Sequence, residues 1–278
     1  MIYVDFSHLL ISCYFAQERE VGEVTESDFR KHVLHTLFIV HNRFKHQFGE
    51  LIVCCDGRRS WRYEIYPHYK ARRKITRAEE AVKWKEIDRL NRLLRDELLE
   101  HAVFRVVCVP GAEGDDVIAI LSLNNHEPSV IISEDKDFHQ LHKLPYISQY
   151  SKRRDSVYRT ESPEDDLKEK IIRGDRNDSI PNLHSKDAVF ILNERQTVVS
   201  AKACSIYTDN FFVGDGGIPE AYKAHFERNQ KLISFEFIPE SIRTLVLEEF
   251  SKPPPSALFA RGKRTHYLVQ AGVKPNSF

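Results

Sequence analysis

The chain has 278 residues, which is enough for one large α/β domain, or such a domain with a small helical annex, around a substantial core. Its 41 basic and 41 acidic residues cancel, so the net charge indicates no class of partner. None of the five cysteines forms a CxxC pair, and no apolar run approaches the ~20 residues of a membrane-spanning helix. We therefore expect a reduced, cytoplasmic protein without membrane contact, located in the host cytoplasm if a phage encodes it.

The first part of the chain contains two predicted strands, and each ends at an aspartate. Residues 1–4 form a predicted buried strand that ends at Asp5. A helix is predicted between Thr25 and Gly49, because apolar residues recur there every three or four positions. Residues 51–55 form the second strand, which ends at Asp56. A single aspartate after a strand is often a helix N-cap or a turn residue, so neither indicates a site when taken alone.

Residues 57–77 follow Asp56 directly and do not continue the strand pattern. Eight basic residues lie between positions 58 and 77 against the single acidic Glu64, and four aromatic residues lie within positions 61–69. A charged segment is usually a solvated face. The aromatic content and the position beside Asp56 instead favour contacts with phosphates and stacking on bases. A long helix is predicted next, and its apolar face consists of Ile87, Leu90, Leu94 and Leu98.

Two further apolar runs, residues 103–109 and 130–132, are predicted strands, and acidic residues follow both. The carboxyl ends of parallel strands are where open α/β sheets bind ligands, so we expect these acids to join Asp5 and Asp56. Such crowding raises carboxylate pKa values, and a divalent cation is the usual compensation. All-oxygen ligation suits Mg²⁺ or Mn²⁺, whereas a zinc site normally contains Cys or His. The acids in question are Glu113, Asp115, Asp116, Asp135 and Asp137.

A second acidic pair is predicted after a helix. Asp116 can simply face the N-terminus of a helix over residues 117–123. Short strands are predicted at 146–150 and 157–158, and a helix then runs from Pro163 to a stop at Gly174. Asp175 and Asp178 follow its C-terminus, where the helix dipole is already negative. A bound cation would resolve that conflict.

The last third of the chain shows fewer signals. Helices are predicted over residues 186–192, 220–230 and 241–250, with a stiff break at the prolines 253–255 and a basic segment at 261–264. The 13 histidines show no metal-binding spacing. Neither a P-loop nor a GxGxxG motif occurs, so a nucleotide site of those kinds is not expected.

The acids at positions 5, 56, 113–116, 135–137 and 175–178 occur in the order and context of the flap endonuclease and 5′ to 3′ exonuclease family, which the chain resembles over almost its whole length. Within the family, the likeness is greatest to the ribonuclease H branch of T-even bacteriophages. The resemblance implies an α/β fold with a central, mostly parallel sheet flanked by helices (a PIN-like 5′ nuclease core). It implies a metal-dependent nuclease core over residues 1–180, including a basic arch segment at 57–77, and a smaller C-terminal helical DNA-binding region over 181–278.

The resemblance also implies roles for single residues, with two Mg²⁺ ions as the cofactor and Mn²⁺ as a substitute. The ligands of the first ion are implied to be Asp5, Asp56, Glu113, Asp115 and Asp135, and those of the second Asp137, Asp175 and Asp178. The implied catalytic residues are Asp5, Asp56, Asp115, Asp135, Lys70 and Arg73. The implied DNA contacts are Arg62, Tyr69, Lys70, Arg72, Arg73 and Lys74.

The chain departs from the family at one motif. Cellular members follow the last Asp pair with a glycine-rich turn that grips duplex DNA and holds a monovalent ion, whereas residues 180–187 here contain no glycine. A monovalent ion is therefore not implied. Duplex contacts by Lys186, Lys202 and the basic tail receive less support from the resemblance.

We expect a Mg²⁺-dependent 5′ to 3′ exonuclease and flap endonuclease that hydrolyses phosphodiester bonds in RNA·DNA hybrids and in flapped or nicked duplex DNA. We expect it to remove RNA primers during replication and to act as a monomer. Its expected protein partners are replication proteins such as a single-stranded DNA-binding protein. One alternative is a non-catalytic, structure-specific nucleic-acid-binding module with a structural cation, but two acid clusters exceed the needs of one closed site. The other is a ribonuclease of the small toxin-type fold, which uses fewer acids and has no arch segment.

Overall fold

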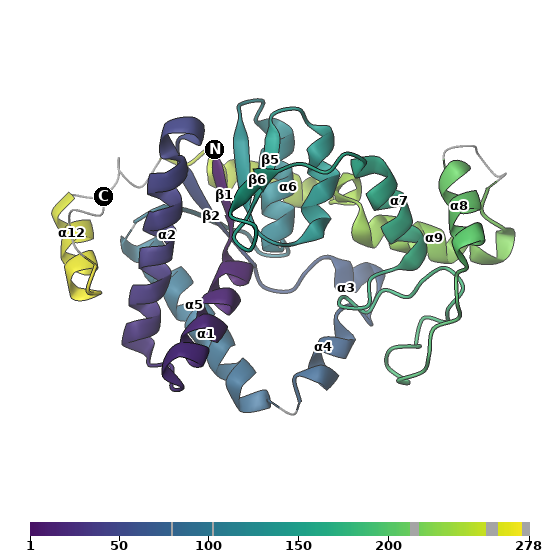
Figure 1. The fold of residues 1–278 in the computed structure, drawn as a ribbon, viewed down its shortest axis with the longest axis horizontal. Helices are drawn as coiled ribbons and strands as arrows, with labels where there is room; N and C mark the ends of the chain where they lie inside the picture. The colour runs from purple at the N-terminus through teal and green to yellow at the C-terminus, as the bar shows by residue number, and fades with distance from the viewer. Residues whose placement is uncertain (79, 102, 212–216, 254–260, 274–278) are drawn as a thin grey trace.

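The structure, a computed structural model, describes residues 1–278 except 79, 102, 212–216, 254–260 and 274–278, and it leaves the side chains of Lys74 and Arg261 undescribed. The described chain contains a six-stranded sheet in the order β3-β2-β1-β4-β5-β6, in which β6 is antiparallel and the other pairs are parallel (Figure 1). The predicted, mostly parallel α/β fold is confirmed. The strands are β1 Ile2–Asp5, β2 Leu51–Cys55, β3 Arg105–Cys108, β4 Ser129–Ile132, β5 Ile147–Ser151 and β6 Ser156–Tyr158.

The central strands are apolar on both faces because each face is covered by helices. Ile2 and Val4 of β1 point into one hydrophobic cluster, and Tyr3 between them points into the other. Strands β2 and β4 alternate in the same way, which fixes the register of Ile2 opposite Leu51 and Val130. A continuous apolar run therefore predicted these strands correctly.

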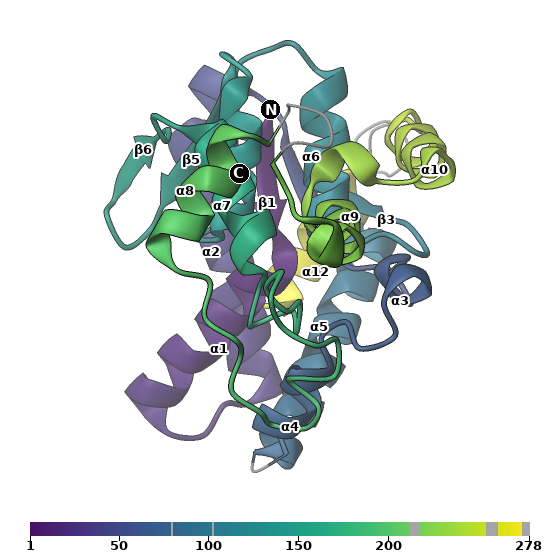
Figure 2. The same cartoon turned by 90° about the vertical axis from the view of Figure 1, so that its right-hand side faces the viewer.

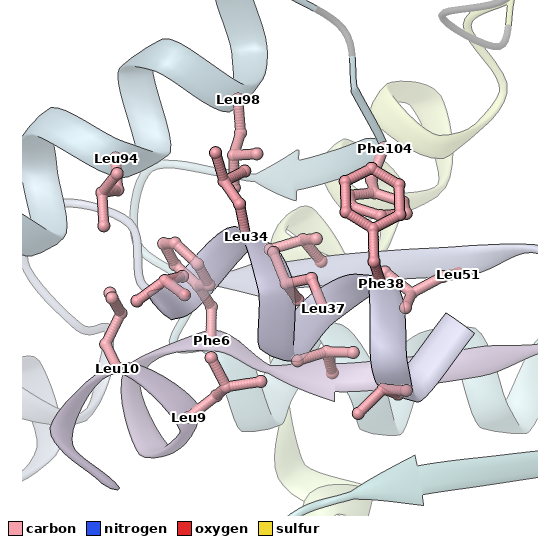
Figure 3. Close-up of a cluster of buried hydrophobic side chains, with 14 of the residues drawn as sticks. Phe6, Leu9, Leu10, Leu34, Leu37, Phe38, Leu51, Leu94, Leu98 and Phe104 are labelled. Carbon is pink, nitrogen blue, oxygen red and sulfur yellow. The ribbon is translucent and has the colours of Figure 1, made fainter. Parts of the chain in front are cut away.

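Helices α1, α2 and α5 cover one face of the sheet, and Figure 3 shows their leucine and phenylalanine side chains meeting above the strands. Helix α2 begins where predicted, with the Thr25 side chain accepting a hydrogen bond from the Asp28 amide, and ends at Gly49. Helix α5 buries the four predicted residues of its apolar face. Helix α1 was not predicted. The helices are α1 Phe6–Val21, α2 Glu26–Phe48, α3 Arg62–Ile65, α4 Ala71–Thr76, α5 Ala81–His101, α6 Gly114–Asn124, α7 Pro163–Arg173, α8 Ala201–Asp209, α9 Glu220–Ile233, α10 Glu240–Phe250 and α12 Arg261–Gln270, with 3-10 helices η1 Lys136–Lys143 and η3 Phe235–Phe237.

Residues 57–77 leave the sheet, as predicted, and contain the short helices α3 and α4. Helix α4 and the beginning of α5 lie at the bottom of Figure 1, well below the strands. We call residues 57–77 the arch segment. Its two ends are anchored differently, because α3 packs against α9, whereas α5 packs against α1 and β3.

The C-terminal region returns to the core. Helix α10 packs against α6 and β3 and adds Ile242 and Val246 to the cluster that contains Tyr3 (Figure 2). Helix α12 packs against α5, where the Tyr267 hydroxyl donates to Glu97 at 2.7 Å. Residues 181–278 are thus partly integrated into the N-terminal unit, and the boundary at 180 stays a prediction.

The helices predicted at 220–230 and 241–250 are confirmed as α9 and α10, but the one predicted at 186–192 is wrong. Turns occupy that stretch, and Ile191 and Leu192 are exposed, so the apolar residues do not share one buried face. Helix α8 was not predicted, and prolines 254 and 255 lie outside the described residues. Among the described helices, none has the length and apolar character needed to span a membrane.

Candidate metal centre

Asp5 lies at the point where the strand order reverses, between β1 and β4, which is where ligands bind in open α/β sheets. Its Oδ1 accepts from the His8 amide at 3.1 Å and so caps α1, while its Oδ2 accepts from the Ser133 hydroxyl at 3.0 Å. Ser133 follows β4, so this bond ties the two strand ends together. The N-cap role and a position at the sheet edge therefore coexist in one side chain.

Asp56 follows β2 and faces the first turn of α6. Its Oδ1 accepts from the Gly114 amide and its Oδ2 from the Ser7 hydroxyl, each at 2.7 Å. A Cβ atom at Gly114 would lie 3.1 Å from the Cys54 carbonyl oxygen, so glycine lets α6 begin close against β2. This close approach brings the acids of the α6 N-terminus to the edge where Asp5 and Asp56 lie.

The first turn of α6 is a capping box in which Glu113 is the N-cap and Asp116 occupies the third helical position. Asp116 is fully buried and accepts from both Nη atoms of Arg62, at 2.8 and 3.0 Å, and from the Trp61 indole at 3.0 Å. Arg62 Nη1 also binds Glu113 at 2.9 Å. Ligand atoms of Glu113, Asp115 and Asp116 lie within 4.8 Å of one another, but Arg62 and Trp61 already satisfy Asp116.

Arg62 is a correction to the expected DNA contacts. Its side chain is buried, and its Nε donates to the Leu232 carbonyl oxygen at 2.9 Å, so it links α3, α6 and the end of α9. Tyr69 is also buried, as are Trp61 and Tyr66. These rings pack inside the protein, and the expected stacking of bases on them is wrong. Sequence alone gave no sign of this, because the covering residues come from distant elements, including α6, α7 and α9.

Tyr69, Lys70 and Arg73 join the arch segment to the acids. The Tyr69 hydroxyl lies 2.7 Å from Glu113 Oε2 and 3.0 Å from Asp178 Oδ2, and the Lys70 ammonium contacts Glu113 directly. Arg73 pairs with Asp178 at 2.5 Å. Burial opposes the charge of Lys70, but Asp178 and Glu113 hold its pKa above its usual range. Lys70 and Arg73 are thus charged groups placed beside both acidic clusters.

Arg72 is partly exposed, and its described hydrogen bonds involve its backbone, whose amide donates to the Ser179 hydroxyl at 2.8 Å and whose carbonyl oxygen accepts from the Thr76 hydroxyl at 3.2 Å. Its guanidinium therefore remains a predicted DNA contact. The side chain of Lys74, another predicted contact, lies outside the described residues.

The carboxylates nearest the strand ends are buried, and the protein cations around them do not fully offset the cost of their negative charge. Burial, reinforced by Asp56, raises the pKa of Asp5 to about 6. Burial also raises the pKa of Asp115 well above its usual range, and Asp116 and Glu113 add to the effect while Arg62 opposes it. Burial would raise the pKa of Glu113 too, but Lys70 and Arg62 lower it. Protein cations thus neutralise Glu113 but leave Asp5 and Asp115 to be stabilised by a bound cation, which fits a divalent ion with oxygen ligands.

Asp135 begins η1 and accepts from the Asp137 amide at 2.9 Å. The side-chain amide of Gln149 in β5 donates to the carbonyl oxygens of Ser133 and Asp135, at 2.7 and 2.8 Å. Both predicted acids after β4 therefore lie on a loop that β5 fixes in place. Glu134, between them in sequence, turns away and binds the Ser151 hydroxyl.

The second cluster depends on Gly174, which has a φ of 70° at the end of α7. A Cβ atom there would lie 2.3 Å from the Ile180 carbonyl oxygen, so glycine is required where Asp175 pairs with Ile180. Asp175 Oδ1 then accepts from the Asp178 amide at 3.1 Å. Asp115, Asp137, Asp175 and Asp178 line one small cavity, so the two predicted clusters adjoin.

Lys170 is a residue of this cluster that the sequence did not reveal. It lies in the last turn of α7, where its ammonium contacts Asp137 and lies 2.8 Å from Asp175 Oδ2. A lysine in that position is also a common helix-end residue, because it offsets the helix dipole. The feature of the sequence that could have indicated this role is the position of Lys170, about one and a half helical turns before Asp175.

Comparison with known proteins places this geometry in context. Residues 1–171 match the family model of the 5′-3′ exonuclease N-terminal resolvase-like domain, and residues 161–276 match that of the T4 RNase H C-terminal region. The chain is 26% identical over 284 residues to a ribonuclease H of Enterobacteria phage T4, and the match covers 97% of this chain and 91% of the relative.

Two solved structures share the fold. One is the T5 D15 protein co-crystallised with metal ions, with a TM-score of 0.59, 18% identity and coverage of 97% of this chain and 98% of the other. The second is a bacteriophage T5 D15 flap endonuclease in a pseudo-enzyme-product complex with DNA and metal ions, with a TM-score of 0.61, 17% identity and coverage of 98% of each chain.

Proposed function

Because the chain belongs to the 5′-3′ exonuclease family, we propose that it is a Mg²⁺-dependent nuclease that removes nucleotides or short oligonucleotides from the 5′ ends and flaps of RNA·DNA hybrids and duplex DNA. The observation that carries the proposal is the meeting of strand-end carboxylates with the arch lysine at one edge of the sheet. The similar proteins agree with this proposal, since they include a ribonuclease H and a flap endonuclease bound to DNA and metal ions.

Two ions are proposed at this edge. The first would be held by the cluster that contains Asp5 and Asp115, and the second by the cluster that contains Asp137 and Asp175. When bound, such a pair supplies an activated water and stabilisation of the departing 3′ oxygen. The proposed ligand sets are Asp5, Asp56, Glu113, Asp115 and Asp135 for the first ion, and Asp137, Asp175 and Asp178 for the second.

Lys70 and Arg73 are proposed to bind the scissile phosphate and to offset its growing negative charge. Both now pair with acids at the cluster boundary, Lys70 with Glu113 and Arg73 with Asp178. Because these pairs place both side chains at the same edge as the carboxylates, a phosphate bound at that edge would meet them. The products are then a 5′ phosphate and a 3′ hydroxyl.

The biological setting is proposed to be removal of RNA primers during replication, by a monomer in the cytoplasm that works beside a single-stranded DNA-binding protein.

Asp135→Asn supplies a matched inactive variant for the test of this function, since it removes a ligand charge without altering the arch segment. We expect a 5′-labelled RNA·DNA hybrid to be shortened over time by the wild type with Mg²⁺. Without Mg²⁺, or with Asp135→Asn, the hybrid should stay intact while a flapped duplex is still bound. Equal cleavage with and without Mg²⁺ would overturn the proposal.

A further inference from the structure

Lys170 lies inside the second acidic cluster and fills it. Its ammonium contacts Asp137 and lies 2.8 Å from Asp175 Oδ2, so one protein cation bridges two of the three acids. These acids come from η1 and from the loop after α7, and Lys170 comes from α7 itself. The lysine therefore takes the position between separate elements that a bridging cation would take.

The space that remains beside Lys170 is too small for a hydrated divalent ion. The cavity lined by Asp137, Lys170, Asp175 and Asp178 has room of only about 10 Å³, which is about the space of one water molecule. Mg²⁺ usually keeps several of its waters when one or two carboxylates bind it. A second ion can enter this cluster only after the ammonium has moved away.

A place for the displaced side chain exists in the neighbouring groove. Lys170 also lines this open groove of about 360 Å³, together with the acids Asp137, Asp166 and Glu169 and the cations Lys136 and Arg173. Asp166 precedes Lys170 by four residues, so both lie on the same face of α7 in the order that favours an acid–lysine pair. Asp166 is exposed and binds His139 at 2.9 Å. The Thr160 hydroxyl donates to the same Oδ2 atom at 3.0 Å, so among the described contacts Oδ1 of Asp166 is open to a lysine.

We infer that Lys170 is a tethered cation that holds the place of the second divalent ion and must swing into the outer groove before that ion binds. Lys170 can have this role only if the proposed function holds, because the role assumes that Asp137, Asp175 and Asp178 take an ion. In the first cluster the protein cations Lys70 and Arg62 pair with Glu113. Asp5 and Asp56 have no such competitor, because among the described contacts their oxygens accept only from uncharged donors. The two ions should therefore bind with different affinities, the second being the weaker.

The test is a Mn²⁺ titration of the full chain without DNA, with free Mn²⁺ followed by electron paramagnetic resonance. Wild type should bind one ion tightly and one weakly. Lys170→Met removes the competing charge and should tighten the second ion about tenfold, with the first ion unchanged. Lys170→Gln should act in the same direction, which protects the result against a folding defect in one variant. Lys170→Arg keeps the charge and should keep the second ion weak.

Lys143→Met is the matched control, because Lys143 pairs with Glu236 on the surface of the same region. It should leave both affinities unchanged. If wild type and Lys170→Met bind two ions with the same affinities, or if the variant binds the second ion more weakly, the proposed role of Lys170 is wrong. The two-ion proposal would still stand. A single bound ion in wild type and in all variants would overturn the two-ion proposal and the role of Lys170 with it.

Discussion

Single residues at this site serve folding and chemistry together. Asp5 caps α1 and Asp135 caps η1, so the ordinary role of an aspartate after a strand is present at both. Both still reach one sheet edge, because the strands that precede them are neighbours. Their convergence could be predicted from the sequence, since it needs only parallel strands that end in acids.

Arg62 and Lys170 could not be placed from the sequence in the same way. The Leu232 carbonyl oxygen that accepts from Arg62 is 170 residues away, and Asp137 is 33 residues from Lys170. No local pattern encodes such contacts. A basic residue beside aromatic residues looked exposed in the sequence, but Arg62 is buried between the start of α6 and the end of α9.

At the residue scale, Lys70→Ala should lower the single-turnover cleavage rate by on the order of 100-fold, because a cation beside the reacting phosphate is lost. Affinity for a flapped duplex should change by less than about threefold, since Lys70 is one of many phosphate contacts. Single-turnover kinetics and equilibrium binding on the same substrate provide both numbers.

Arg72→Ala is the comparison, because Arg72 is partly exposed and its guanidinium is a predicted backbone contact. It should weaken binding and flatten its salt dependence while the single-turnover rate stays near wild type. A loss confined to affinity in Lys70→Ala would show that Lys70 does not act on the reacting phosphate.

At the scale of elements, periodicity predicted α2 and the buried face of α5. The ends of α2 and α7 were also predicted, because a cap residue or a proline marks each start and a glycine each end. Helix α1 was missed because it follows β1 with no turn between them, Asp5 being both the strand end and the cap. The helix predicted at 186–192 failed for another reason. Side chains hold that loop, including Asn182, which donates to the Thr197 carbonyl oxygen at 2.8 Å.

The buried Arg62 links three elements, so its replacement should lower the stability of the fold. Arg62→Met leaves Asp116 buried without its main partner, so the free energy of unfolding should fall by about 3–5 kcal/mol. Urea denaturation measures the change. Arg59→Met, in an exposed position of the same segment, should stay within about 0.5 kcal/mol of wild type. Equal midpoints for the two variants would show that Arg62 does not hold α3 against α6 and α9.

At the scale of the whole molecule, the fold gathers acidic side chains at one edge, where a bound cation would stabilise their charged forms. The pKa of Asp5 is raised to about 6, above its value in the unfolded chain, so the metal-free fold favours the protonated form. For this group, stability is therefore highest at low pH and falls as the pH rises through about 6. A divalent ion binds the charged form and cancels that loss.

The stabilisation by Mg²⁺ should consequently grow with pH. We expect a larger rise in Tm on adding Mg²⁺ at about pH 7.5 than at about pH 5, where protons compete for Asp5. Thermal denaturation at both values, with and without Mg²⁺, measures it, and Asp5→Asn should lose most of the difference. The same rise in Tm at both values would contradict a metal site built on Asp5.

The most direct test of the central claim is the dependence of cleavage on Mg²⁺ concentration in wild type, Asp178→Asn and Asp5→Asn. If two carboxylate clusters bind separate ions, Asp178→Asn should still fold and retain the first ion, but should require a higher Mg²⁺ concentration to cleave. Asp5→Asn should stay inactive at every concentration. Identical Mg²⁺ curves for wild type and Asp178→Asn would show that Asp175 and Asp178 only shape the loop after Gly174, and activity in Asp5→Asn would contradict the proposed catalytic centre itself.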